Sequence, residues 1–83
     1  MISKESQAVS ADAKRIYEQR LRIRLEDAQF GRYAAIEPIS GDYFLGDTFD
    51  EAVNAALERH ADRLTHTIRI GHPAALHLGV LVQ

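Results

Sequence analysis

Four histidines are the side chains that first suggest a bound metal in this sequence. They are His60, His66, His72 and His77. Neutral imidazole is a common zinc ligand, and two histidines four residues apart on a helix can bind the same ion. These histidines are instead separated by five or six positions, and the chain contains no cysteine. We therefore expect surface or partly buried histidines, with no metal and no cofactor.

Carboxylates and hydroxyls offer a second route to chemistry. Acidic residues that could hold Mg²⁺ or act as an acid–base pair gather in the middle of the chain. They are Asp42, Asp47, Asp50 and Glu51. Most of them stand where a helix begins and unpaired backbone amides favour carboxylates, so helix capping explains them better. Thr65 and Thr67 flank His66, but neighbouring strand side chains point to opposite faces. The sequence therefore predicts a non-catalytic protein, not an enzyme.

Basic residues concentrate in the amino-terminal third of the chain. They are Lys14, Arg15, Arg20, Arg22 and Arg24. A basic helix can follow nucleic-acid phosphates, but the formal net charge of −2 gives no overall attraction to phosphate. No aromatic platform or helix-turn-helix pair accompanies these residues. We expect a solvated face or a contact with an acidic protein, and we keep a small nucleic-acid-binding protein as the alternative function.

Length and composition limit the architecture. A chain of 83 residues forms one domain, and at this size only about 60–65% of the unfolded surface becomes buried. Without disulfides, association with another chain is the main remaining source of burial. No run approaches the ~18 apolar residues of a membrane span, and the polar start lacks a signal-peptide core. We expect a cytoplasmic protein that forms a homo-oligomer or binds a protein partner, with no membrane and no small-molecule substrate.

The first element expected is an amphipathic helix over residues 11–27, with Ser10 as its N-cap. Residues 1–9 should be disordered, and residues 10–83 form the single domain. Apolar residues recur every three or four positions along the helix. They are Ala13, Tyr17, Leu21, Leu25 and Ala28. Residues 21–25 also alternate as a strand would, but the length of the pattern favours a helix. Whether this helix packs on its own sheet or on another chain stays open.

A β-hairpin is expected next. Residues 33–38 and 43–45 are typical of strands, and the turn between them includes Gly41, which can adopt a positive φ. Thr48 and Glu51 then fit a capping box. In this motif the Thr48 side chain bonds the backbone amide of Glu51, and the Glu51 side chain reaches back to the amide of the cap residue. The chain therefore passes from the second strand into a helix through a tight, capped junction.

The second helix should extend over residues 49–63 and place an apolar stripe on the hairpin. The stripe consists of Phe49, Val53, Ala56, Leu57 and Leu64. Residues 65–70 alternate as a strand with one buried face. A strand–helix–strand connection is right-handed, and its simplest path passes over the first strand. We predict an α+β fold of element order α-β-β-α-β, with a helix packed on a small three- or four-stranded sheet of strand order 2-1-3.

Residues 76–82 are strongly apolar and have β character. They would form either a fourth strand of the same sheet or an added strand on the sheet edge of a partner. Since no residues indicate catalysis, we predict a non-catalytic protein-interaction module. It would dimerise or hold a partner through its first helix and this segment. The predicted partner-binding residues are Tyr17, Arg20, Leu21, Arg24, Leu76, Leu78 and Val80.

Three stretches carry a resemblance to known proteins, namely residues 33–38, 41–43 and 46–56. Together they resemble small bacterial and cyanobacterial proteins of unknown function. More loosely, they are similar to the amino-terminal module of HicB-type antitoxins, where a Gly-Asp-Thr-x-x-Glu-Ala stretch opens the helix that lies on a small sheet. The antitoxins continue into a DNA-binding domain, whereas this sequence stops at Gln83, so autorepression is not expected. The resemblance implies an antitoxin-like or small regulatory subunit that binds another protein, such as a toxin or an enzyme encoded beside it.

Overall fold

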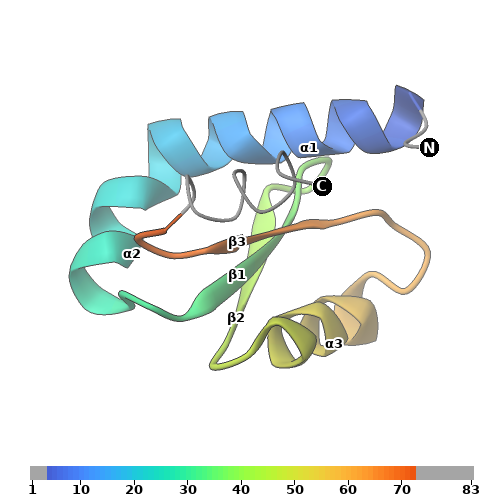
Figure 1. Ribbon diagram of the computed structural model, residues 1–83. Coiled ribbons are helices and arrows are strands. Elements are labelled where there is room, and N and C mark those ends of the chain that lie inside the picture. The colour runs from blue at the N-terminus through green and yellow to red at the C-terminus, as the bar shows by residue number, and fades with distance from the viewer. Residues whose placement is uncertain (1–3, 73–83) are drawn as a thin grey trace, which may run out of the picture.

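The computed structural model describes residues 4–72 (Figure 1). A three-stranded antiparallel sheet lies between two helical layers, with the amino-terminal helix on one face and α3 (Phe49–Arg59) on the other. The predicted α+β class and the α-β-β-α-β order are confirmed. The predictions for His77 and for residues 76–82, with Leu76, Leu78 and Val80, lie outside the described residues.

The sheet is built around β1 (Tyr33–Glu37), which is its central strand. Both β2 (Asp42–Gly46) and β3 (His66–Arg69) pair with it in antiparallel orientation. Ala35 lies opposite Phe44 on one side and opposite Thr67 on the other. The resulting order β2-β1-β3 is the predicted order 2-1-3.

The hairpin turn between β1 and β2 is organised by the carboxylate of Glu37, which is fully buried. It accepts hydrogen bonds from the backbone amides of Ile39 and Ser40, both at 2.9 Å. Arg63, which follows α3, donates to the same carboxylate at 3.1 Å. Gly41 closes the turn with a φ of 81°, which a residue with a Cβ rarely adopts. The turn is therefore fixed to the sheet and to the segment after α3.

The amino-terminal helix comprises three consecutive segments. They are α1 (Lys4–Ile16), a π-helical turn η1 (Tyr17–Leu21) and α2 (Arg22–Ala28). The helix begins before the predicted N-cap Ser10, which lies inside α1, and residues 4–9 are helical instead of disordered. Val9 is half-buried, so the apolar stripe extends one turn upstream of Ala13. Packing against the sheet explains the earlier start, because tertiary contacts supply most of the stability of such helices.

The π-helical turn keeps the apolar stripe on the sheet. Residues four apart on an α-helix are offset by roughly 40°, so a stripe with this spacing would rotate away from the sheet within a few turns. In η1 the amide of Arg22 bonds to the carbonyl of Tyr17, five residues earlier, which widens the turn. Ala13, Tyr17, Leu21 and Leu25 consequently all remain buried. Of the predicted stripe, Ala28 is exposed.

The core on this side of the sheet contains large side chains. Tyr17, Leu21 and Leu25 pack on residues of β1, of β3 and of the position just after β3 that face the helix. Those residues are Ala34, Ile36, Ile68 and Ile70. Tyr43 and Leu45 of β2 border the cluster. The amino-terminal helix therefore packs on its own sheet, which resolves the open question of where this helix docks.

The core on the α3 side is made of small residues. Ala35 contacts Ala52 and Ala56, all of them fully buried. The predicted stripe is wrong in part, because Phe49 is 52% exposed and Leu57 is 45% exposed. Alanines let the helix approach the sheet closely, and this rotates the larger residues to its side. A Cβ added at Gly46 would lie 2.5 Å from the backbone nitrogen of Ala52.

Candidate functional site

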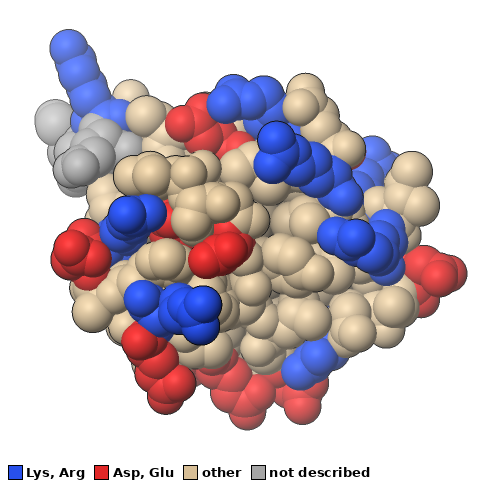
Figure 2. All heavy atoms as spheres, turned by 180° about the vertical axis from the view of Figure 1, so that it is seen from behind, with Lys and Arg blue, Asp and Glu red and all other residues tan. Residues whose placement is uncertain are grey.

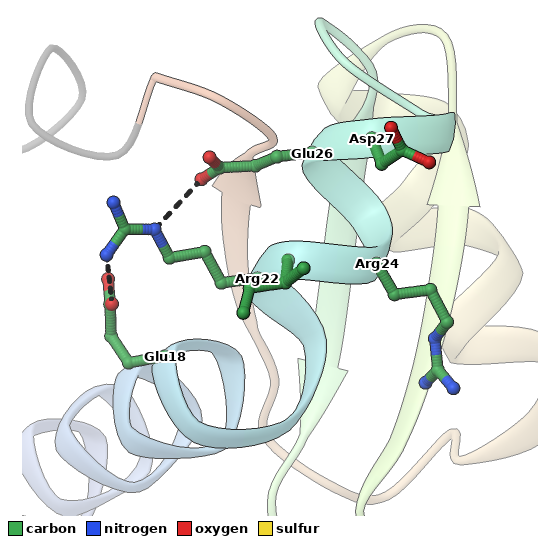
Figure 3. Close-up of a pocket in the computed structure, with 6 residues that line it drawn as sticks. Glu18, Arg22, Arg24, Glu26 and Asp27 are labelled. Carbon is green, nitrogen blue, oxygen red and sulfur yellow. Dashed lines mark hydrogen bonds and ion pairs between the residues drawn. The ribbon is translucent and has the colours of Figure 1, made fainter.

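A hollow on the outer face of the amino-terminal helix is the best candidate for a functional site (Figure 3). It lies where η1 joins α2. Its lining residues are Glu18, Arg22, Ile23, Arg24, Glu26 and Asp27. Ile23 is 87% exposed, more than any other large apolar residue in the described part of the chain. The hollow thus combines one apolar side chain with several charged ones.

Arg22 bridges two of the three carboxylates that line the hollow, as the dashed lines in Figure 3 show. Its Nη1 lies 2.9 Å from Glu18 Oε1, and its Nε lies 3.5 Å from Glu26 Oε2. The hydrogen bond to Glu18 raises the pKa of Arg22. Glu18 and Glu26 are therefore both engaged with a permanent cation.

Tyr17 connects the hollow to the core. Its hydroxyl donates to Glu26 Oε2 at 2.8 Å and accepts from the backbone amide of Gly71 at 3.4 Å. Burial, followed by the hydrogen bond to Glu26, raises the pKa of Tyr17 to about 12. The hydroxyl stays protonated at physiological pH, and Tyr17 ties the helix to the backbone just beyond β3.

The structure divides the predicted contact residues of the first helix into two groups. Tyr17 and Leu21 are buried on the chain's own sheet, at 1% and 4% exposure. Neither side chain is accessible to a partner in this conformation, because both are packed against the sheet of the same domain. Arg20 and Arg24 are exposed, and no ion pair is found for either within residues 4–72. Figure 3 shows Arg24 directed away from the Arg22–Glu26 pair.

The other arginines of the helix are paired with neighbouring acids. Arg15 lies 2.6 Å from Asp12, and Arg22 lies 2.9 Å from Glu18. On the face seen from behind in Figure 2, basic groups are scattered around a central area of uncharged residues. Such an arrangement differs from the continuous basic stripe that follows a phosphate backbone.

His66 has a contact that sequence reasoning missed. Its Nδ1 lies 3.2 Å from the hydroxyl of Ser10, which comes from α1. Burial and then the nearby charge of Lys14 lower the pKa of His66, so the ring is neutral. Within residues 4–72 no carboxylate contacts the other ring nitrogen to orient it, as nucleophilic catalysis by serine requires. The separation of Ser10 and His66 in sequence hid the pair, and only the docking of α1 on β3 brings them together.

The remaining described histidines make structural contacts. His60 lies 2.9 Å from Asp42 and packs edge-on against Phe44, and its hydrogen bond lowers the pKa of Asp42. His72 packs against Phe30 with ring centroids 5.0 Å apart. Between residues 4 and 72 no group of three or more His, Asp or Glu side chains is placed to hold a metal ion.

Thr48 caps α3 as predicted, but Glu51 reaches back to the amide of Asp47, one residue before Thr48, and not to that of Thr48 itself. The amide of Glu51 donates to Thr48 Oγ1 at 3.1 Å, and Glu51 Oε1 accepts from the amide of Asp47 at 2.9 Å. Asp47 also pairs with Arg32 of the segment before β1, at 2.8 Å. These carboxylates are therefore explained by the helix start and by its attachment to the sheet.

Comparison of the chain with models of protein families, with curated proteins and with solved structures finds no match. The resemblance to HicB-type antitoxins consequently stays a prediction. Among the described helices, none has both the length and the apolar character needed to cross a membrane.

Proposed function

We propose that this protein is a non-catalytic protein-interaction module that binds its partner through the outer face of the amino-terminal helix. The observation that carries the proposal is the exposure of Ile23, 87%, in a hollow whose rim includes Arg24. Arg20 lies one turn upstream and is also exposed, but it lines a separate hollow beside the hairpin turn at Gly41. An apolar side chain beside an arginine without a local acid partner is typical of the residues that dominate protein interfaces.

The chemistry of this face indicates the kind of partner. A pocket of apolar side chains would take Ile23, and a carboxylate at its rim would meet Arg24. Arg22 is already held by Glu18 and Glu26, so it keeps the hollow in shape and adds little attraction of its own. The same ion pairs, with that of Arg15, reduce the charge available to phosphate and count against the alternative of nucleic-acid binding. The antitoxin-like resemblance also points to a protein as the partner.

A pull-down with the products of neighbouring genes, followed by calorimetric titration of the stoichiometric companion, tests the proposal. Ile23→Ser should weaken binding by at least about tenfold, as truncation of a central interface residue does. Arg24→Glu should weaken it as well and reduce its dependence on salt. Leu64→Ser is the matched control, since Leu64 is an exposed apolar residue away from this helix.

Two results would contradict the proposal. One is the absence of any stoichiometric companion. The other is equal binding by wild type and Ile23→Ser while Leu64→Ser weakens it, which would move the contact to the α3 side of the molecule.

A further inference from the structure

The free edge of β3 offers a second surface, separate from the helix face. In the described part of the chain β3 pairs only with β1. Just beyond it, the amide of Ile70 donates to Arg32 and its carbonyl accepts from Gly31. Backbone groups alternate in direction along an antiparallel strand, so those of Thr67 and Arg69 point away from β1. Such a row of outward N–H and C=O groups is a template for another strand.

Arg69 is the one charged residue of this edge, and its guanidinium lies over the ring of Tyr33. Natural edge strands are commonly protected by lysine, by proline or by a bulge. Residues 65–70 contain neither lysine nor proline, and the register between β1 and β3 runs without interruption from Ile36–His66 to Tyr33–Arg69.

An apolar stripe of α3 borders the same edge. Phe49, Val53 and Leu57 are four residues apart and therefore share one side of the helix. The ring of Phe49 packs edge-on against Tyr33, with centroids 6.4 Å apart. Tyr33 lies opposite Arg69 of β3, whose guanidinium carbon is 5.6 Å from the centre of its ring. The exposed side of α3 thus lies next to β3, and a chain added at this edge would adjoin it.

We propose that β3 pairs in antiparallel orientation with β3 of a second copy of this chain, about a two-fold axis at Thr67. In this register Thr67 faces its own counterpart and exchanges both backbone hydrogen bonds with it. Arg69 faces Thr65 of the second copy, and His66 faces Ile68. No like charges are opposed in this register, so the edge can meet its own copy about a two-fold axis without charge repulsion. The two sheets become one six-stranded sheet.

Charged substitutions at Thr67 test both whether β3 forms the dimer contact and whether the two-fold axis lies at this residue. Thr67→Lys and Thr67→Glu each place like charges opposite each other at the axis and should raise the dissociation constant of the dimer by at least about fivefold. An equimolar mixture of the two variants should recover a heterodimer, because opposite charges then meet. Light scattering and sedimentation measure the mass of each sample. Ile39→Lys, in the exposed hairpin turn between β1 and β2, is the control and should leave the dimer intact.

Amide hydrogen exchange of the wild-type protein gives a reading without any substitution. The amide of Thr67 should become protected as protein concentration rises through the dissociation constant, whereas that of Ile68, bonded to β1, should be protected throughout. A monomer at all concentrations would overturn the proposal, whether the Thr67 amide is open or is protected by another part of the same chain. A dimer that survives both charge variants would overturn it equally. Failure of Ile23→Ser to affect partner binding would leave this result untouched, so the two proposals fail separately.

Discussion

The two faces of the sheet are covered in different ways. On one face the amino-terminal helix buries Tyr17, Leu21 and Leu25 against isoleucines of the sheet. On the other face α3 contributes only Ala52 and Ala56, and its larger side chains stay at the surface. The first face gains stability mainly from the apolar area that it removes from water. The second gains less from area and depends on close approach of the helix.

Polar contacts at both ends compensate for the small core of α3. Thr48 and Glu51 cap its start. Beyond its end, His60 pairs with Asp42, and Arg63 pairs with Glu37. One helix is therefore held by its middle and the other by its ends. Substitutions at Leu21, Gly46 and Glu37 probe this difference, in order of decreasing effect.

The same substitution, leucine to alanine, can be made in both helices, at Leu21 and at Leu57, and the losses in the free energy of unfolding compared. Leu21 is 4% exposed and Leu57 is 45% exposed. Removal of the buried side chain leaves a cavity and should lower the free energy of unfolding by about 3 kcal/mol. Removal of the exposed one should change it by about 0.5 kcal/mol or less. Urea denaturation in dilute solution measures both, and equal losses would show that α3 is held by its large side chains after all.

Gly46→Ala tests the close approach of α3. The new methyl group would lie 2.5 Å from the nitrogen of Ala52 and 2.9 Å from the carbonyl carbon of Glu51, so the helix must move. Such overpacking should cost about 2 kcal/mol. Gly31→Ala is the control, since Gly31 has a φ of 87° and nothing within 4 Å of an added Cβ. It should cost only the backbone strain, about 1 kcal/mol. Thermal unfolding of both variants separates the two effects.

The sequence predicted the fold through local signals. Capping residues at Thr48 and Glu51, the turn at Gly41 and the alternation before Gly71 located the hairpin, α3 and β3 within a few residues. The strand order followed from the handedness of the connection. Each of these signals acts over a short stretch of chain, and a single sequence displays it directly.

The errors arose where long-range packing decides. Periodicity alone placed Phe49 and Leu57 against the sheet, but the alanines approach it more closely and rotate the helix. The start of the first helix was missed because contacts with β3 stabilise a polar segment. The candidate site was found only in part, since Arg24 was predicted, Ile23 was not, and Arg20 lines a separate hollow beside the hairpin turn. An isoleucine between arginines looks like an ordinary helix residue until the burial of Leu21 and Leu25 shows which side faces water.

The contribution of the Glu37 carboxylate to stability can be measured from the pH dependence of unfolding. Burial raises the pKa of Glu37, but hydrogen bonds from Ser40, Ile39 and Arg63 outweigh it and lower the pKa from 4.5 to about 2. The folded state therefore binds this proton less readily than the unfolded state. Its contribution to stability is complete above pH 4.5 and disappears as pH falls towards 2. The wild-type protein should lose stability over this interval.

Glu37→Gln removes the charge while keeping the shape of the side chain. At neutral pH it should lower the free energy of unfolding by about 1.5 kcal/mol, because charge-assisted hydrogen bonds to Ser40 and Arg63 are weakened. Its stability should also fall less steeply than that of wild type between pH 4.5 and 2. Asp12→Asn is the control, since Asp12 pairs with Arg15 on the exposed side of the other helix. Parallel pH profiles for wild type and Glu37→Gln would mean that apolar contacts, and not this carboxylate, hold the end of α3.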